Sequence, residues 1–127
     1  PWNKGQTWLE LVPAVPHHLV AGYMQNADAF LMFSDDENFP CVIAEALCTG
    51  LPVITTTAGG SAEVITEANG LVVPVGNEKA LSSAVITMLE NHAKYKNRSI
   101  QDAAAKMFSS EVIGQKFIDL YRKLGAD

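Results

Sequence analysis

The fold is decided by residues 29–57, which read AFLMFSDDENFPCVIAEALCTGLPVITTT. Two apolar runs of strand length, 29–33 and 53–57, stand at the ends of this stretch. Between them, Pro40 near the first turn and Gly50 beyond the last turn predict a helix over 41–48. A strand, a helix and a second strand in this order are typical of a parallel sheet with crossover helices.

The same alternation continues along the rest of the chain. Apolar residues 71–75 predict a third buried strand, and helical patterns are expected at 19–26, 62–66 and 80–89. The sequence therefore predicts an α/β fold, a parallel Rossmann-like sheet with helices on both faces, with residues 1–127 as a single domain.

Several local signals add detail to this prediction. Asn77 is the expected N-cap of the 80–89 helix, and Ser99 with Asp102 resembles a capping box. An apolar stripe over 113–124 predicts a last helix, which is part of the core or a docking face. Residues 8–15 predict at most a short edge strand because they contain Pro13.

Composition and charge exclude several classes of protein. The 127 residues suit one domain, and 48% hydrophobic residues suffice for a core. Nine basic and fourteen acidic residues leave a net charge of −5, which argues against a general nucleic-acid binder or a polybasic membrane-surface protein. The longest apolar run is too short to span a bilayer. Cys41 and Cys48, two helical turns apart, are expected to be buried free thiols.

Basic residues are absent from the part of the chain where a ligand is expected. No Lys or Arg occurs from Gly5 through Glu78, whereas nine acidic residues do. Open α/β sheets bind ligands at the loops that leave the carboxyl ends of their strands, and here those loops are acidic and rich in glycine. An anionic ligand would therefore depend on backbone amides and helix N-termini, or on cations from another segment.

Two glutamates flank the predicted helix start. Glu37 lies in the loop before the 41–48 helix, and Glu45 lies on its second turn. The exposed amides of a first helical turn attract phosphate, and ionised carboxylates accept hydrogen bonds from hydroxyl groups. A diphosphate between two polyols, as in a nucleotide sugar, fits this arrangement. Solvated surface glutamates and the carboxylate pair of a glycoside hydrolase are the other interpretations, the latter without the other parts of such a site.

Four blocks of sequence resemble family-4 (group 1) glycosyltransferases, whose GT-B architecture has two facing Rossmann-like domains. An Ala27-Asp28-Ala29 run, an apolar strand and Ser34 are similar to the family's "AD-strand-PS" pattern, with Phe33 in place of the proline. Residues 45–53 are close to "EAMACGLPV", 59–63 resemble "GGxxE" and 69–73 resemble "NGLLV". The blocks stand in the family's order, between about residues 15 and 89, and correspond to roughly the second half of its C-terminal domain.

The resemblance implies a role for each residue around the helix start. Glu37 would be the catalytic residue and would hydrogen-bond the hydroxyls of the donor sugar, whereas Glu45 would accept from the ribose hydroxyls. Backbone amides around 39–43 would face the diphosphate and the sugar. The expected donor-binding residues are Ser34, Glu37, Asn38, Phe39, Pro40, Cys41, Val42, Ile43, Glu45, Gly59 and Gly60. No metal and no other cofactor is expected.

This sequence departs from the family pattern at the helix start. The family's usual "EGFG" is Glu37-Asn38-Phe39-Pro40 here. Pro40 has no N–H, so one possible phosphate donor is lost, and Asn38 replaces a glycine that eases a tight turn. Donor affinity or sugar choice is therefore expected to differ from the family norm.

The resemblance also implies that parts of the enzyme lie outside this chain. In the family, the Arg and Lys that hold the diphosphate come from the first half of the C-terminal domain, and the acceptor site comes from the N-terminal domain. The family's strand order is 3-2-1-4-5-6, and the strands here would correspond to 4, 5 and 6, with strand 3 as a further candidate and without the central strand 1. We therefore expect a piece of a larger enzyme, whose exposed sheet edge is filled by missing sequence or by a second copy in a homodimer.

The function implied is that of the nucleotide-sugar-binding portion of a retaining hexosyltransferase. Such an enzyme moves a sugar from a nucleotide diphosphate donor to a hydroxyl acceptor in glycan, lipid or polysaccharide biosynthesis; this chain alone is expected to be inactive. The alternatives are a non-catalytic nucleotide-sugar-binding module and a structural fragment that self-associates through its sheet edge. The regions that contact the base and the acceptor are expected elsewhere. The expected location is cytoplasmic, and peripheral to the inner membrane in the full-length enzyme; no nucleic-acid partner is expected.

Overall fold

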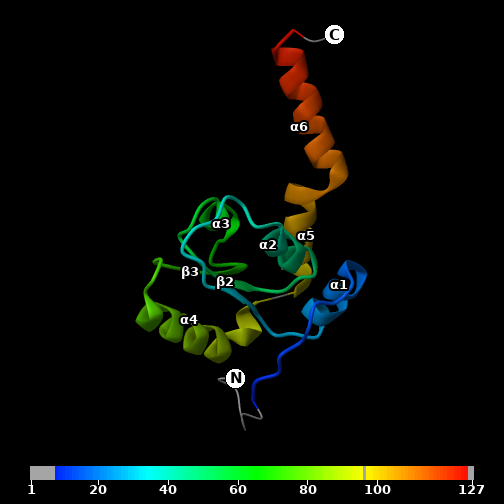
Figure 1. Cartoon of the computed structure of the whole chain (residues 1–127). Helices are drawn as coiled ribbons and strands as arrows, with labels where there is room; N and C mark the ends of the chain where they lie inside the picture. Colours follow the sequence, from blue (N-terminus) through cyan, green and yellow to red (C-terminus); the bar gives the residue numbers. More distant parts are fainter. Residues whose placement is uncertain (1–7, 96, 126–127) are drawn as a thin grey trace.

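The computed structural model describes residues 8–95 and 97–125. Figure 1 shows the elements, which follow in the order α1 (His17–Gln25), β1 (Phe30–Met32), α2 (Cys41–Cys48), β2 (Val53–Thr56), α3 (Ser61–Val64), β3 (Gly70–Val73), α4 (Glu78–Glu90), the 3₁₀ turn η1 (His92–Lys94), α5 (Asn97–Phe108) and α6 (Ser110–Lys123). The three predicted strands and the 41–48 helix are confirmed. The helices expected at 19–26, 62–66 and 80–89 are present as α1, α3 and α4, with shifted boundaries.

The described sheet is parallel and has the order β1-β2-β3. Phe30 of β1 aligns with Val53 of β2, which aligns with Gly70 of β3. Connections between neighbouring parallel strands are right-handed, and both crossovers run in the same direction across the sheet. As a result α2 and α3 lie on one side of the sheet and α4 lies on the other (Figure 1). The predicted α/β fold with helices on both faces is confirmed.

The outer edge of β1 has no neighbouring strand in the described part of the chain. This agrees with the expected exposed edge, and what fills it stays a prediction.

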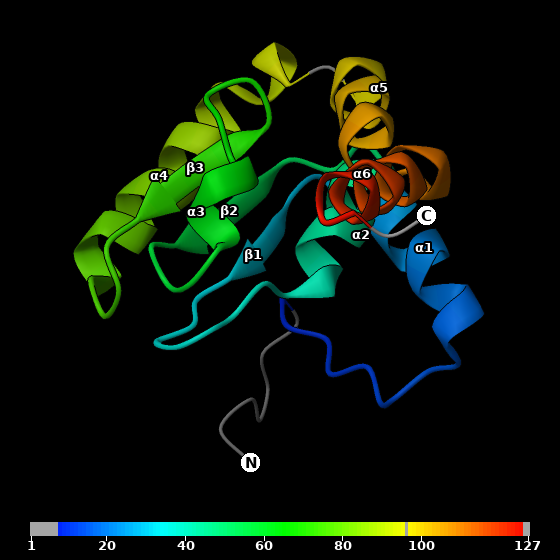
Figure 2. The same cartoon turned by 90° about the horizontal axis from the view of Figure 1, so that it is seen from above.

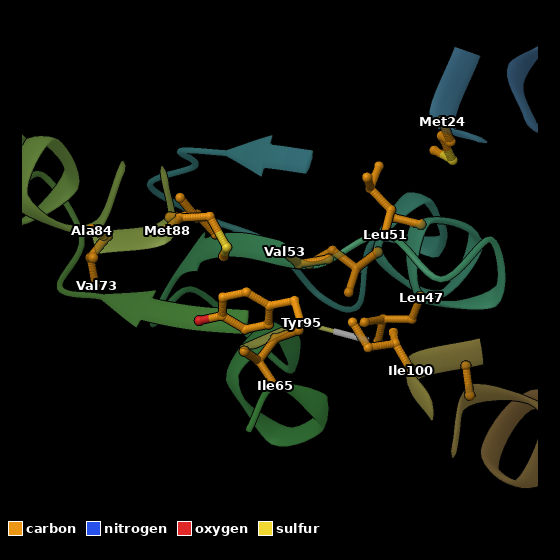
Figure 3. Close-up of a cluster of buried hydrophobic side chains, with 14 residues drawn as sticks. Met24, Leu47, Leu51, Val53, Ile65, Val73, Ala84, Met88, Tyr95 and Ile100 are labelled. Atoms are coloured by element: carbon orange, nitrogen blue, oxygen red, sulfur yellow. The ribbon is translucent and has the colours of Figure 1, made fainter. Parts of the chain in front are cut away.

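The core lies where the helices cover the central strand. All four residues of β2 are buried, as is usual for a parallel strand covered on both faces. Figure 3 shows Val53 of β2 among Leu47 of α2, Met88 of α4 and Ile100 of α5, together with Tyr95, which precedes α5. Helix α2 follows the carboxyl end of β1, so its start lies at the carboxyl edge of the sheet, where a ligand is expected.

The two helix caps expected from the sequence, at Asn77 and Ser99, gave different outcomes. The Asn77 side chain accepts a hydrogen bond from the Ala80 N–H at 3.0 Å, so the predicted N-cap of α4 is confirmed. The capping box expected at Ser99 is wrong, because α5 already begins at Asn97. Residues 8–15, where Pro13 allowed at most a short edge strand, form no strand.

Helix α6 extends away from the rest of the described chain (Figure 1). It contains no buried residue, and its apolar stripe is exposed at Ile113, Phe117, Leu120, Tyr121 and Leu124. The stripe is therefore an exposed helix face and not part of the core. None of the helices in residues 8–95 and 97–125 combines the length and the apolar character needed to cross a membrane.

Candidate functional site

Two loops meet at the carboxyl edge of the sheet. One connects β1 to α2 and the other connects β2 to α3; Figure 2 shows both at the same end of the parallel strands. The Gly60 N–H donates to the Asn38 carbonyl oxygen at 2.6 Å, and the Thr56 hydroxyl donates to the Ser34 carbonyl oxygen at 2.6 Å. These bonds fix residues 34–40 against the end of β2.

Gly59 allows this close approach. Its φ is +53°, in the left-handed region, and a Cβ atom there would overlap the carbonyl oxygen of Glu37. Both the backbone conformation and the available space thus require glycine. Packing between the two loops explains Gly59 without a ligand, and a contact between Gly59 or Gly60 and a donor stays a prediction.

Glu37 is held inside its own loop. The side chain is partly buried, and its Oε1 accepts a hydrogen bond from the Ser34 hydroxyl at 3.0 Å. Asn38 and Phe39 are exposed, and the Phe39 ring lies near that of Phe108 at the end of α5, with centroids 6.0 Å apart. The loop before α2 therefore presents one oriented carboxylate, and its Phe39 packs against the end of α5.

Helix α2 begins without a side-chain cap. Pro40 is the N-cap residue and makes no side-chain capping bond. The Ile43 N–H donates to the Pro40 carbonyl oxygen at 3.0 Å, so this amide is already used. The N–H groups of Cys41 and Val42 precede the first N–H that is hydrogen-bonded within the helix. Like the opening amides of any helix, they point outward from its N-terminal end. These two amides are the natural anion donors at this position.

Glu45 lies on the α1 side of the same helix. Its Oε1 is 3.2 Å from Nε2 of His17, and both residues line a pocket of about 220 Å³ between α1 and α2. Apolar side chains such as Val20 and Met24 form most of its wall. Glu37 does not line this pocket. Along the chain, the first turn of α2 thus lies between Glu37 and Glu45. Of these two carboxylates, only that of Glu45 lines the pocket.

The cysteines of α2 are free and exposed, so the expectation of buried thiols is wrong. The helix instead turns Ile43, Ala46 and Leu47 toward the core. Although Cys48 is exposed as a residue, desolvation of its thiol raises the pKa of this group. Cys48 therefore stays a neutral thiol and is a poor nucleophile near neutral pH. No cluster of three or more potential metal ligands occurs among residues 8–95 and 97–125.

Sequence reasoning did not find the contribution of α1 to this site. His17 and His18 are adjacent, and no spacing or motif singles out either of them. Only the packing of α1 beside α2 brings His17 to Glu45. A sequence signal for this contact would need paired changes at positions 17 and 45 in related chains.

The chain is similar to proteins of a known family. Residues 6–107 match the family described as glycosyl transferases group 1. A D-inositol 3-phosphate glycosyltransferase from Nocardioides sp. is 30% identical over 122 residues, which cover 94% of this chain and 26% of that protein. A GDP-mannose-dependent alpha-mannosyltransferase from Mycobacterium tuberculosis is 35% identical over 92 residues, 68% of this chain and 24% of that protein. This chain thus spans about a quarter of the length of these curated relatives.

Solved structures give a consistent result. Sucrose-phosphate synthase from Thermosynechococcus elongatus superimposes with a TM-score of 0.80 and 31% identity, over 92% of this chain and 30% of that one. The Anabaena protein HepE, crystallised in complex with UDP, superimposes with a TM-score of 0.71 and 26% identity, over 80% of this chain and 29% of that one. The family match, the relatives and the shared fold agree, and the chain belongs to the group 1 glycosyltransferases.

Proposed function

We propose that this chain is the nucleotide-sugar-binding portion of a retaining glycosyltransferase, which moves a hexosyl group from a nucleotide diphosphate sugar to a hydroxyl acceptor. One observation carries the proposal: the uncapped start of α2 lies at the carboxyl edge of the sheet, with Glu37 before it and the Glu45 pocket after it. This order of groups matches the order of sugar, diphosphate and nucleoside in the ligand.

The diphosphate would bind at the opening amides of α2. A helix N-terminus attracts anions through its unpaired N–H groups and its dipole. The absence of Lys and Arg between Gly5 and Glu78 means that further neutralisation of the diphosphate would come from other parts of the protein. The relatives, of which this chain covers 26% and 24%, have ample length for such groups.

The two carboxylates would bind the two ends of the donor. Glu37, oriented by Ser34, would accept hydrogen bonds from the sugar hydroxyls, and Glu45 would accept from the ribose hydroxyls. The apolar pocket beside Glu45 would hold part of the nucleoside, in addition to the base contacts that are expected in other parts of the protein. Complexes of HepE with UDP and with UDP-glucose support a ligand of this class.

The chemistry would follow from position and charge. In the reaction the bond from the anomeric carbon to the diphosphate oxygen breaks, and a bond from the same carbon to the acceptor oxygen forms. The acceptor hydroxyl loses its proton, which the departing phosphate oxygen would accept. Negative charge then grows on the leaving diphosphate, which the amides at the start of α2 would stabilise. Glu37 would act as the catalytic residue by holding the sugar in the reactive orientation. No metal or other cofactor is part of the proposal.

Calorimetric titration of this chain tests the proposal. We expect UDP-glucose or GDP-mannose to bind, and UDP to bind about tenfold more tightly than UMP, because only UDP places a second phosphate at the helix start. Free glucose is the control and should not bind measurably. Equal affinities for UDP, UMP and uridine, or no binding of any nucleotide, would contradict the proposal.

Turnover separates the proposed enzyme from a non-catalytic binding module. Pro40, which removes one N–H from the phosphate site, is the observation that favours the second candidate. This chain alone should transfer no sugar. A longer protein containing it should transfer sugar if the enzyme proposal holds, and should only bind donor if it is a module.

A further inference from the structure

His17 on α1 contacts Glu45 on α2 across 28 positions of sequence. The two side chains approach to 3.2 Å between Nε2 and Oε1. His17 is 86% exposed and Glu45 is 39% exposed, so water can reach both. An ionised carboxylate only accepts hydrogen bonds, so chemistry assigns the proton to Nε2 of the imidazole.

This contact leaves Glu45 able to bind a ligand. A carboxylate has two oxygens and about four acceptor positions, and His17 uses one position on Oε1. Within the described residues, Glu45 makes no other side-chain hydrogen bond, so acceptor positions remain for a ligand. The long side chain of an exposed glutamate otherwise samples several rotamers, so the imidazole limits that freedom and orients the carboxylate before a ligand arrives.

We propose that His17 is a positioning residue of the donor site: its imidazole donates a hydrogen bond to Glu45 and orients that carboxylate toward the ribose hydroxyls. This inference rests on the proposed function, because it assigns Glu45 to the ribose. It predicts that nucleotide-sugar affinity depends on a hydrogen-bond donor at position 17.

Four forms of the chain test whether the hydrogen bond from position 17 to Glu45 supports donor binding. They are the wild type, His17→Ala, His17→Gln and the control His18→Gln, each titrated with UDP-glucose and with GDP-mannose. The diphosphate of these sugars is substituted at both ends and does not titrate near neutral pH. Glutamine can still donate a hydrogen bond to Glu45 but cannot become charged.

We expect His17→Ala to bind about tenfold more weakly than the wild type, because the donor to Glu45 is lost. His17→Gln, which keeps a donor, should bind nearly as well as the wild type, and so should the control His18→Gln. A Glu45→Ala chain should show no further loss when His17→Ala is added, because the imidazole acts through that carboxylate.

Each result has a distinct meaning. If His17→Ala binds like the wild type, or if its loss persists unchanged in the Glu45→Ala background, the role of His17 is overturned while the proposed function stands. If the wild type binds neither nucleotide sugar, the proposed function fails, and the inference fails with it. Circular dichroism of each variant confirms that the exposed substitution leaves the fold intact.

Discussion

Glu45→Ala should weaken the binding of UDP-glucose or GDP-mannose by about a hundredfold. The substitution removes the acceptor for the ribose hydroxyls, and hydrogen bonds to a charged group contribute about 1.5–3 kcal/mol. Glu45→Gln keeps an acceptor oxygen but loses the charge, so we expect an intermediate loss. Calorimetry or ligand-observed NMR with the same nucleotide sugars measures both variants.

A matched control removes one negative charge elsewhere. Glu90 lies at the end of α4 and is exposed, so Glu90→Ala changes the net charge by the same amount. This variant should bind the donor as the wild type does. If Glu45→Ala and Glu90→Ala gave equal affinities, Glu45 would have no part in binding, and the assignment of the pocket to the nucleoside would be wrong.

Gly59→Ala should lower the free energy of unfolding by about 3 kcal/mol or more. A left-handed conformation costs a residue with a side chain about 1–2 kcal/mol, and here the new Cβ would also overlap the Glu37 carbonyl oxygen. The loop before α2 must move to relieve this overlap, so the donor affinity should fall as well. Chemical denaturation measures the first effect and calorimetry measures the second.

Gly76 isolates the conformational part of that effect. Its φ is +68°, similar to the +53° of Gly59, but a Cβ there would meet nothing within 4 Å. Gly76→Ala should therefore cost only about 1–2 kcal/mol and leave donor binding unchanged. Equal losses of stability for the two variants would show that the close contact between the loops contributes nothing.

The sheet and α2 could be predicted from sequence because their signals are local. Three apolar runs mark the strands, of which the central β2 is buried throughout, and α2 has the predicted bounds of 41–48 because Pro40 and Gly50 mark its ends. Gly50 has a φ of +83°, the left-handed conformation that commonly ends a helix. Such boundaries depend on the residues themselves and little on distant packing.

The rest of the site depends on contacts between distant segments. The approach of Gly59 to Glu37 and the pairing of His17 with Glu45 join residues 22 and 28 positions apart, and neither partner marks the other in the sequence. Resemblance to the family identified the residues around α2, but it did not indicate that α1 forms one wall of the pocket. That wall arises only when α1 packs beside α2.

The most direct test of the account is the map of backbone amide shifts when the ¹⁵N-labelled chain is titrated with UDP-glucose and with GDP-mannose. We predict the largest changes at the opening amides of α2, Cys41 and Val42, with accompanying changes at Glu37, Glu45 and His17. The turn at Gly76 and helix α6 should not change. Shifts concentrated on α6 or on the turn at Gly76, with the start of α2 unmoved, would contradict the claim that this helix start binds the diphosphate of a nucleotide sugar.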